Sequence, residues 1–140
     1  MHVFIFFASL YKISSQQFLV QVIIDNGMDA SHPALADYAV SGWNFPAGND
    51  AVYDPSYPMD YAHGTHVAGI IADTAGQTGA NVSIMPLRVF DNGTAYTSDI
   101  IAAIEYAASA GAQIVNCSFG CAQYNQALYD AVSASGIYIQ

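Results

Sequence analysis

The strongest constraint on the fold is a repeated alternation between short β-branched runs and segments with helical periodicity. Apolar, β-branched residues predict strands over 19–24, 82–90 and 113–118. Apolar residues at helical spacing predict helices over 63–73, from the cap signals at 97–98 to Gly111, and from Asn125 to Gly136. A helix between two strands usually carries the chain back so that the strands pair in parallel. The pattern therefore predicts an α/β fold with a mostly parallel sheet and helical crossovers.

Shorter signals complete this outline. Residues 38–45 predict a further strand, the segment 46–60 is rich in Pro, Gly, Asn and Asp and predicts a loop, and 74–80 predicts a connection after the first helix. Pro86 predicts a kink in its strand. Residues 137–140 look like the beginning of another strand, so we expect the sheet to be incomplete at the C-terminus.

Composition limits the classes of function. The chain has 140 residues, of which 54% are hydrophobic and 9% are charged, as in a single core-rich globular domain. Its formal net charge is -9, because 11 Asp and Glu are balanced by only 2 Lys and Arg. So few cations argue against nucleic acid and against anionic membrane surfaces as partners. We therefore expect a domain with an acidic, solvated surface.

The chain opens on an apolar run that is too short to span a bilayer. The run has the length of a signal peptide's apolar core, but no Lys or Arg precedes it. We interpret 1–18 as an uncertain apolar leader or the start of a fragment, with a first strand as a further alternative.

Two titratable side chains stand at the ends of predicted elements. Asp25 follows the strand over 19–24 and precedes Asn-Gly, which is a turn signal. Open α/β sheets bind their ligands at the carboxyl ends of their strands. His63 begins a helix of small and apolar residues, where a ring that titrates near neutral pH can act as a general acid or base. The alternative is that both are ordinary polar residues at a strand end and a helix start.

The same segments carry a family resemblance. VIIDNG at 22–27 and HGTHVAGI at 63–70 resemble the Asp and His blocks of the subtilisin-like serine proteases (the subtilase family, peptidase family S8), in that family's order. SHPAL at 31–35 is similar to the family's SHPDL segment, and QIVNCSFG at 113–120 to its INMSLG strand. The resemblance implies a subtilisin-like fold, with 19–140 forming the N-terminal part of a peptidase domain.

The resemblance implies a serine endopeptidase, which hydrolyses peptide bonds with a Ser-His-Asp triad. In this reading Asp25 orients and stabilises the histidine, His63 is the acid–base catalyst, and His66 is structural. The family's nucleophile lies in a block similar to GTSMA, and this sequence contains no such block. Asn116 and Ser118 are not assigned the oxyanion or nucleophile role. We therefore expect the chain alone to be inactive and to need the missing C-terminal half of the domain.

The resemblance also implies two edges that would hold a polypeptide substrate in an extended conformation, as an added strand. On the residues alone, the two segments also fit a plain turn and a plain strand end. The first edge is Gly93, Thr94 and Ala95, with Tyr96 as an apolar lid, and the second is Ser118, Phe119 and Gly120.

No metal or cofactor is expected. The family's SHPDL aspartate, which is a calcium ligand in many members, is Ala34 here, and its absence argues against a calcium site. A metal hydrolase built on Asp25, Asp60, His63 and His66 is disfavoured, because the HExxH spacing and its glutamate base are absent. Asp60 is also a candidate for lining the pocket beside His63.

The two cysteines, Cys117 and Cys121, leave the redox compartment undecided. They could form a disulfide only if the loop between them folds back. We expect Cys117 to behave as a small buried hydrophobe. An extracellular location is implied by the family resemblance.

Two alternatives to an enzyme fit the same residues. One is a non-catalytic, protease-like module that binds extended peptides, and the other is an inactive gene fragment. Stable folding with measurable peptide affinity would favour the first, and aggregation would count against it.

Overall fold

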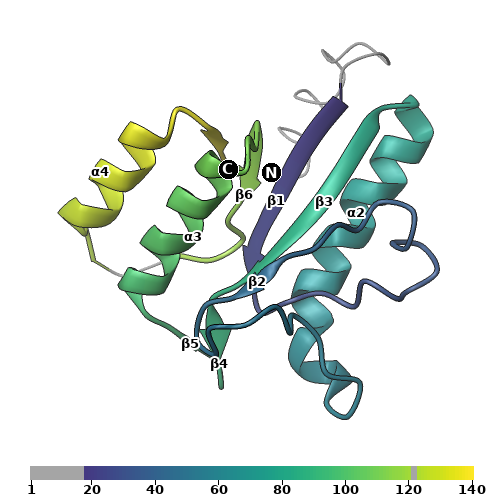
Figure 1. Ribbon diagram of the computed structural model, residues 1–140, viewed down its shortest axis with the longest axis horizontal. Helices are drawn as coiled ribbons and strands as arrows, with labels where there is room; N and C mark the ends of the chain where they lie inside the picture. The colour runs from purple at the N-terminus through teal and green to yellow at the C-terminus, as the bar shows by residue number, and fades with distance from the viewer. Residues whose placement is uncertain (1–17, 121–122) are drawn as a thin grey trace.

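The computed structural model describes residues 18–120 and 123–140. Its main feature is a five-stranded parallel sheet with the strand order β2-β3-β1-β6-β7 (Figure 1). Helices lie in every connection between its successive strands except the one from β1 to β2. The predicted α/β fold with a mostly parallel sheet and helical crossovers is therefore confirmed. The strands are β1 (Phe18–Asp25), β2 (Trp43–Asn44), β3 (Asn81–Arg88), β6 (Ile114–Asn116) and β7 (Tyr138–Ile139).

Helices cover both faces of the sheet. Helix α2 (Ala62–Thr78) packs on one face, and α3 (Thr97–Ser109) and α4 (Gln126–Ser135) pack on the other (Figure 1). Both faces of an all-parallel sheet are normally covered in this way. The remaining elements are a single 3-10 turn η1 (Pro58–Tyr61), which leads directly into α2, and an antiparallel hairpin of β4 (Phe90–Asp91) and β5 (Thr94–Ala95), which follows β3.

The side chains of β1 divide the interior into two cores. Ile23 belongs to the core under α2, which also contains Ile71, and Ile24 belongs to the core under α3, which also contains Ile104. Successive side chains of a strand point to opposite faces of its sheet. Burial on both faces fixes the path of β1 and therefore the place where Asp25 ends it.

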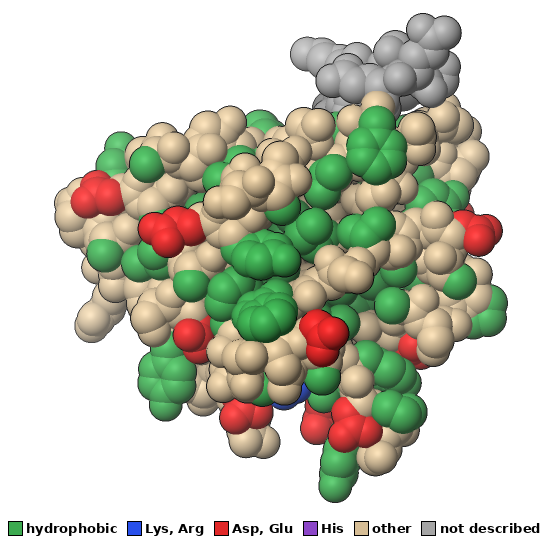
Figure 2. Space-filling view, in the orientation of Figure 1, with side chains coloured by type: hydrophobic (Ala, Val, Ile, Leu, Met, Phe, Trp, Pro, Cys, Tyr) green, Lys and Arg blue, Asp and Glu red, His purple; other side chains and the backbone are tan. Residues whose placement is uncertain are grey.

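The surface reflects the composition. On the face drawn in Figure 2, hydrophobic and uncharged atoms predominate, Asp and Glu are scattered, and Lys or Arg shows only as a small patch. Within 18–120 and 123–140, no helix combines the length and the hydropathy needed to cross a bilayer.

Helix α2 is longer than predicted, so the connection expected over 74–80 is wrong for 74–78, and only 79–80 connect α2 to β3. The hydroxyl groups of Thr74 and Thr78 each donate to the carbonyl oxygen four residues earlier at 2.8 Å, which allows these polar residues to stay within the helix. The helix ends at Gly79, whose φ of 69° is the left-handed conformation that glycine adopts most readily.

The strand predicted over 38–45 is interrupted. An isolated bridge forms at Ala39, and pairing with β3 resumes only at Trp43. Pro86 of β3 faces the gap and has no N–H to donate across it. Gly42 approaches this proline so closely that a Cβ there would lie 1.8 Å from the proline carbonyl oxygen. The kink expected at Pro86 does not interrupt β3, which pairs with β1 along its whole length.

The other helix ends agree only partly with the sequence signals. Asn125 caps α4, since its side-chain oxygen accepts a hydrogen bond of 3.0 Å from the backbone N–H three residues on, and Gly136 ends the helix with a φ of 66°. The cap expected at 97–98 is wrong, because Tyr96 holds the N-cap position of α3 and makes no side-chain capping bond.

Two predictions fall outside the described residues. The interpretation of 1–18 as a leader or fragment start concerns a segment that is almost wholly undescribed. A disulfide between Cys117 and Cys121 likewise involves a residue that is not described.

Candidate active site

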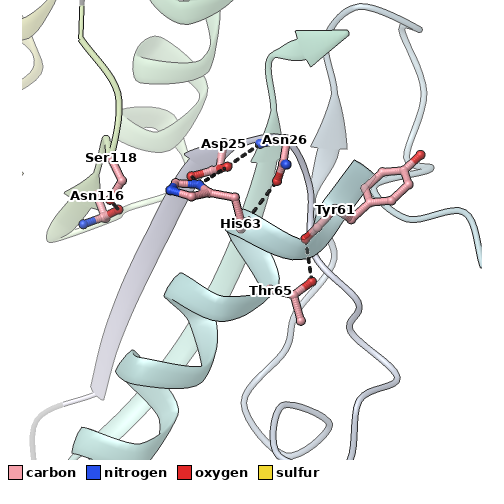
Figure 3. A network of polar contacts seen from close by, with 8 residues as sticks. Asp25, Asn26, Tyr61, His63, Thr65, Asn116 and Ser118 are labelled. Atoms are coloured by element: carbon pink, nitrogen blue, oxygen red, sulfur yellow. Dashed lines mark hydrogen bonds and ion pairs between the residues drawn. The ribbon is translucent and has the colours of Figure 1, made fainter. Parts of the chain in front are cut away.

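The centre of the candidate site is a contact between Asp25 and His63. Asp25 is the last residue of β1 and is 3% exposed, and its Oδ1 accepts a hydrogen bond of 2.7 Å from the backbone N–H of Asn26. His63 is the second residue of α2, and its Nδ1 lies 2.8 Å from both carboxylate oxygens of Asp25 (Figure 3). An ionised carboxylate can only accept hydrogen bonds, so this contact favours a proton on Nδ1.

A second contact fixes the start of α2 against the turn after β1. The side-chain oxygen of Asn26 accepts a hydrogen bond of 2.9 Å from the backbone N–H of Gly64 (Figure 3). Gly64 is pressed against the backbone of Gly27, and a Cβ at Gly64 would lie 2.0 Å from that carbonyl oxygen. Close packing therefore requires glycine at 27 and at 64, and the role of Asn26 is its hydrogen bond to Gly64. The sequence analysis treated these residues as a turn signal, as small residues of a helix and as parts of the two family blocks, and did not predict the contact between them.

The turn before His63 is held by Tyr61. Its backbone carbonyl accepts a hydrogen bond of 2.8 Å from the hydroxyl of Thr65 (Figure 3). Its ring is buried and meets the ring of Tyr53 edge-on. The same ring covers Gly27, where an added Cβ would lie 2.6 Å from it. These contacts give His63 a fixed starting point for its side chain.

A cavity of about 670 Å³ opens beside His63. It is lined on one side by the residues before α2, including Asp60, and on the other by the β4–β5 hairpin. Of the two predicted substrate edges, Gly93, Ser118 and Phe119 line this cavity. Its lining does not include the other four predicted edge residues, which are Thr94, Ala95, Tyr96 and Gly120.

The second edge is ordered by its own contacts. The hydroxyl of Ser118 donates to the side-chain oxygen of Asn116 at 2.7 Å (Figure 3). The ring of Phe119 meets the ring of Phe90 edge-on, with a centroid distance of 5.4 Å, and so joins this edge to the hairpin. Such aromatic pairs add to the burial of both rings.

Cys117 lies between Asn116 and Ser118 in the sequence. Burial first, and the negative charge of Asp25 second, raise the pKa of the Cys117 thiol from its usual 9.0 to about 12. A thiol with so high a pKa is protonated at neutral pH and is a poor nucleophile. The expectation that Cys117 behaves as a small hydrophobe agrees with this environment, although its side chain is only half-buried.

The second histidine does not join the first. His66 is exposed and lines a separate hollow of about 550 Å³ on the other side of the α2 start, together with Asp29 and His32. Among the described residues, no three His, Cys, Asp or Glu side chains are arranged to hold a metal ion. His63 and His66 line different cavities, so the structure does not bring together the residues of the metal-hydrolase alternative.

Arg88 is a cavity residue that sequence reasoning missed. Its Nε donates to the carbonyl of Phe90 at 3.0 Å, and its Nη1 donates to the hydroxyl of Tyr61 at 3.1 Å. The sequence did contain a signal, since Arg88 and Lys12 are the only cations of an acidic chain.

The fold and the site together define a class: a parallel α/β protein that presents a buried aspartate paired with a histidine at the carboxyl edge of its sheet. The family model described as "Subtilase family" (Peptidase_S8) matches residues 18–139. The chain belongs to the subtilase family of serine proteases.

Known proteins of the same family show the extent of the similarity. The chain is 43% identical over 119 residues to "Thermophilic serine proteinase" of Bacillus sp. (strain AK1), a match that covers 79% of this chain and 28% of that protein. It is 36% identical over 119 residues to "Thermitase" of Thermoactinomyces vulgaris, with 79% and 40% covered. The crystal structure of a cold adapted subtilisin-like serine proteinase superposes with a TM-score of 0.71 at 27% identity, covering 91% of this chain and 46% of that one. The chain thus spans less than half the length of the relatives that it matches.

Proposed function

We propose that Asp25 and His63 are two members of the Ser-His-Asp triad of a serine-type endopeptidase. The observation that carries this proposal is the pair of 2.8 Å distances from His63 Nδ1 to the carboxylate of Asp25. A neutral histidine that keeps its proton on Nδ1 offers Nε2 as a base, and a buried carboxylate stabilises the imidazolium that forms. Within the described residues Nε2 makes no hydrogen bond, so it is open to an incoming hydroxyl.

In the proposed reaction His63 moves one proton in each step. Nε2 takes the proton of the serine hydroxyl as that oxygen bonds to the carbonyl carbon of the substrate. The histidine then gives this proton to the amine nitrogen as the C–N bond breaks, which leaves an acyl-enzyme. Water attacks the acyl-enzyme in the same way and releases the acid and the free serine.

This sequence contains no segment similar to the family's nucleophile block. We propose that 19–140 is the N-terminal part of a peptidase domain, that the C-terminal part supplies the nucleophile, and that the chain alone has no turnover. Triad members act as a unit, so two of them without the third retain little catalysis.

The proposed substrate is a polypeptide bound in an extended conformation between the two edges of the cavity, with the hairpin at Gly93 on one side and Ser118–Phe119 on the other. Proteases of this family act on polypeptides, and the cavity between these edges lies beside His63. The strongly negative charge of the chain supports a role without nucleic acid or anionic membrane partners. An extracellular location is proposed from the family alone, and fractionation of the native cells would test it.

The test is complementation with and without His63. The purified chain is incubated with fluorescence-quenched casein, alone and together with a separately produced polypeptide comprising the portion of thermitase that this chain does not match. We expect no turnover by the chain alone, turnover by the mixture, and a loss on the order of a thousandfold when the chain carries His63→Ala. Turnover by the chain alone that His63→Ala abolishes would overturn the claim of inactivity. Complementation that is indifferent to His63→Ala would overturn the triad assignment.

A further inference from the structure

Arg88 lies at the carboxyl edge of the sheet, beside the residue that ends the neighbouring strand. It is the last residue of β3 and pairs in register with Asp25 of the neighbouring strand. It is the only Lys or Arg in the part of the chain that the structure describes, and its side chain is 17% exposed. A single guanidinium is therefore held at the same edge as the Asp–His pair, largely shielded from water.

The guanidinium joins both sides of the cavity. Toward α2, Nη1 donates to the hydroxyl of Tyr61 at 3.1 Å, and the guanidinium carbon lies 5.0 Å from the centre of that ring. Toward the hairpin, Nε donates to the carbonyl of Phe90 at 3.0 Å, and Nη2 lies 3.4 Å from the carboxylate of Asp91. The ion pair with Asp91 is exposed at the carboxylate and contributes little. The two shorter hydrogen bonds and the ring contact therefore form the connection.

The hairpin depends on contacts of this kind. It has only two residue pairs, Phe90 with Ala95 and Asp91 with Thr94, and the turn between its strands is the dipeptide Asn92-Gly93 with positive φ at both residues. A two-stranded hairpin of this size is barely stable without tertiary contacts. The ring of Phe90 and the guanidinium of Arg88 hold it from two directions.

The Asp–His pair depends on different contacts. The 2.9 Å hydrogen bond from Gly64 to Asn26 and the packing of Gly64 on Gly27 fix the start of α2 directly to the end of β1. Arg88 touches neither His63 nor Asp25 through any hydrogen bond in the described residues. Loss of Arg88 should therefore loosen the hairpin and leave the Asp–His contact in place.

The geometry points to Arg88 as a positioning residue, which fixes the β4–β5 hairpin to the turn at Tyr61 and so sets the position of one wall of the cavity. This role rests on the proposed function, because that cavity is where the extended peptide would bind. We expect lysine to be a poor replacement, because its ammonium is a compact point charge without the planar guanidinium that reaches Phe90 and Tyr61 while lying over the Tyr61 ring.

The experiment compares the full 140-residue chain with Arg88→Lys, Arg88→Met and Tyr61→Phe. Tyr61→Phe removes the hydroxyl that accepts from Arg88 and keeps the ring with its contacts to Tyr53, Gly27 and Arg88. Tyr129→Phe on the exposed surface of α4 is its matched control. Backbone ¹⁵N relaxation should show order parameters at 91–94 falling from about 0.85 to below about 0.6 in both Arg88 variants, with a smaller fall in Tyr61→Phe. Order parameters in α3 and the proton resonance of His63 Nδ1 should stay unchanged.

A second readout connects the hairpin to binding. The affinity of the chain for a blocked, alanine-rich hexapeptide should fall at least tenfold in both Arg88 variants.

Unchanged order parameters at 91–94 in all three variants, or an equal fall of the order parameters in α3, would overturn the role of Arg88. If Arg88→Met does not fold, Arg88→Lys and Tyr61→Phe decide the question on their own. Absence of peptide binding by the unaltered chain would count against the proposed extended-peptide site of this chain, while the relaxation data would still decide the role of Arg88.

Discussion

Nδ1 of His63 lies at the same 2.8 Å from both carboxylate oxygens of Asp25, across a sequence separation of 38 residues. The carboxylate is buried at the end of the central strand, whereas the side chain of His63 is 54% exposed. One partner of the contact is therefore rigid and shielded, and the other can reach a substrate. Removal of the aspartate charge should change the histidine without unfolding the sheet.

We predict that Asp25→Asn removes the downfield proton resonance of His63 Nδ1. The amide that replaces the carboxylate can donate as well as accept, so it no longer fixes the proton on Nδ1. In the complemented enzyme the same change should lower kcat on the order of ten-thousandfold, the size of effect that the wrong tautomer has in other serine proteases.

The control for this change is Asp60→Asn. Asp60 is exposed, lines the same cavity and lies three residues before His63. Its loss alters the local charge equally and leaves the contact with Nδ1 untouched. Loss of the resonance in both variants would show that general electrostatics, and not the direct contact, holds the proton.

Gly64→Ala should strongly destabilise the chain. Its Cβ would lie 2.0 Å from the carbonyl oxygen of Gly27, and neither backbone can move without breaking the hydrogen bond to Asn26. Overpacking of this kind costs about 1–3 kcal/mol and occasionally more. The free energy of unfolding in urea measures it.

Gly69→Ala is the matched control in the same helix. No atom lies within 4 Å of a Cβ at Gly69, so the substitution should stabilise α2 by about 1 kcal/mol through helix propensity. Equal effects of the two substitutions would contradict the proposed close contact at Gly64.

Gln21→Met should stabilise the chain. The side chain of Gln21 is fully buried in β1, and neither its oxygen nor its nitrogen has a hydrogen-bond partner among the described residues. Methionine has nearly the same shape and removes an unpaired buried amide, a change of about 1–3 kcal/mol in the free energy of unfolding.

Asn44→Leu provides the contrast. Asn44 is equally buried, but its amide donates to the carbonyl of Ala51 at 2.8 Å and accepts from the N–H of Ala47 at 3.2 Å. Its replacement removes both hydrogen bonds, whose partners Ala47 and Ala51 are exposed, and should destabilise the chain by about 0.5–1.5 kcal/mol for each bond lost. A stabilising effect of Asn44→Leu would show that these hydrogen bonds contribute nothing.

The stability of the chain should fall in alkali because of Cys117. Its pKa is about 12 in the folded chain, against a usual 9.0, so between these values the unfolded chain has lost a proton that the folded chain keeps. The contribution is fully present below pH 9 and is lost as the pH rises through 12. The difference in unfolding free energy between the unaltered chain and Cys117→Ala, measured at several pH values, should therefore shrink across this window. A constant difference would show that the thiol has an ordinary pKa.

The sequence predicted the helices and strands correctly where residues within the element itself determine its beginning or end. The end of α4 at Gly136 depends on a residue whose own chemistry dictates its position. The strand over 38–45 failed because the obstacle lies elsewhere in the chain, at Pro86, where a neighbouring strand would need an N–H. The residues of 38–45 alone give no sign that the neighbouring strand has a proline, and therefore no N–H, at the position where the two strands would pair.

The candidate site divides in the same way. The motif blocks identified Asp25 and His63, but Arg88 acquires its contacts only when β3, the hairpin and the turn at Tyr61 meet. Of the four predicted edge residues outside the cavity lining, Thr94 and Gly120 directly follow a lining residue, whereas Ala95 and Tyr96 lie farther along the chain toward α3. Sequence therefore located the segments of the site better than it located the side chains within them.

The strand order of the sheet has a consequence for folding. The central strand β1 precedes both of its neighbours by dozens of residues, since Phe18 pairs with Asn81 and Gln21 with Ile114. Each pairing must close a long loop before it gains any contact, and folds dominated by such non-local pairings form slowly. During synthesis β1 leaves the ribosome well before the segments that cover it. Until those segments follow, its apolar side chains and unpaired backbone are exposed to chaperones and to aggregation with other nascent chains.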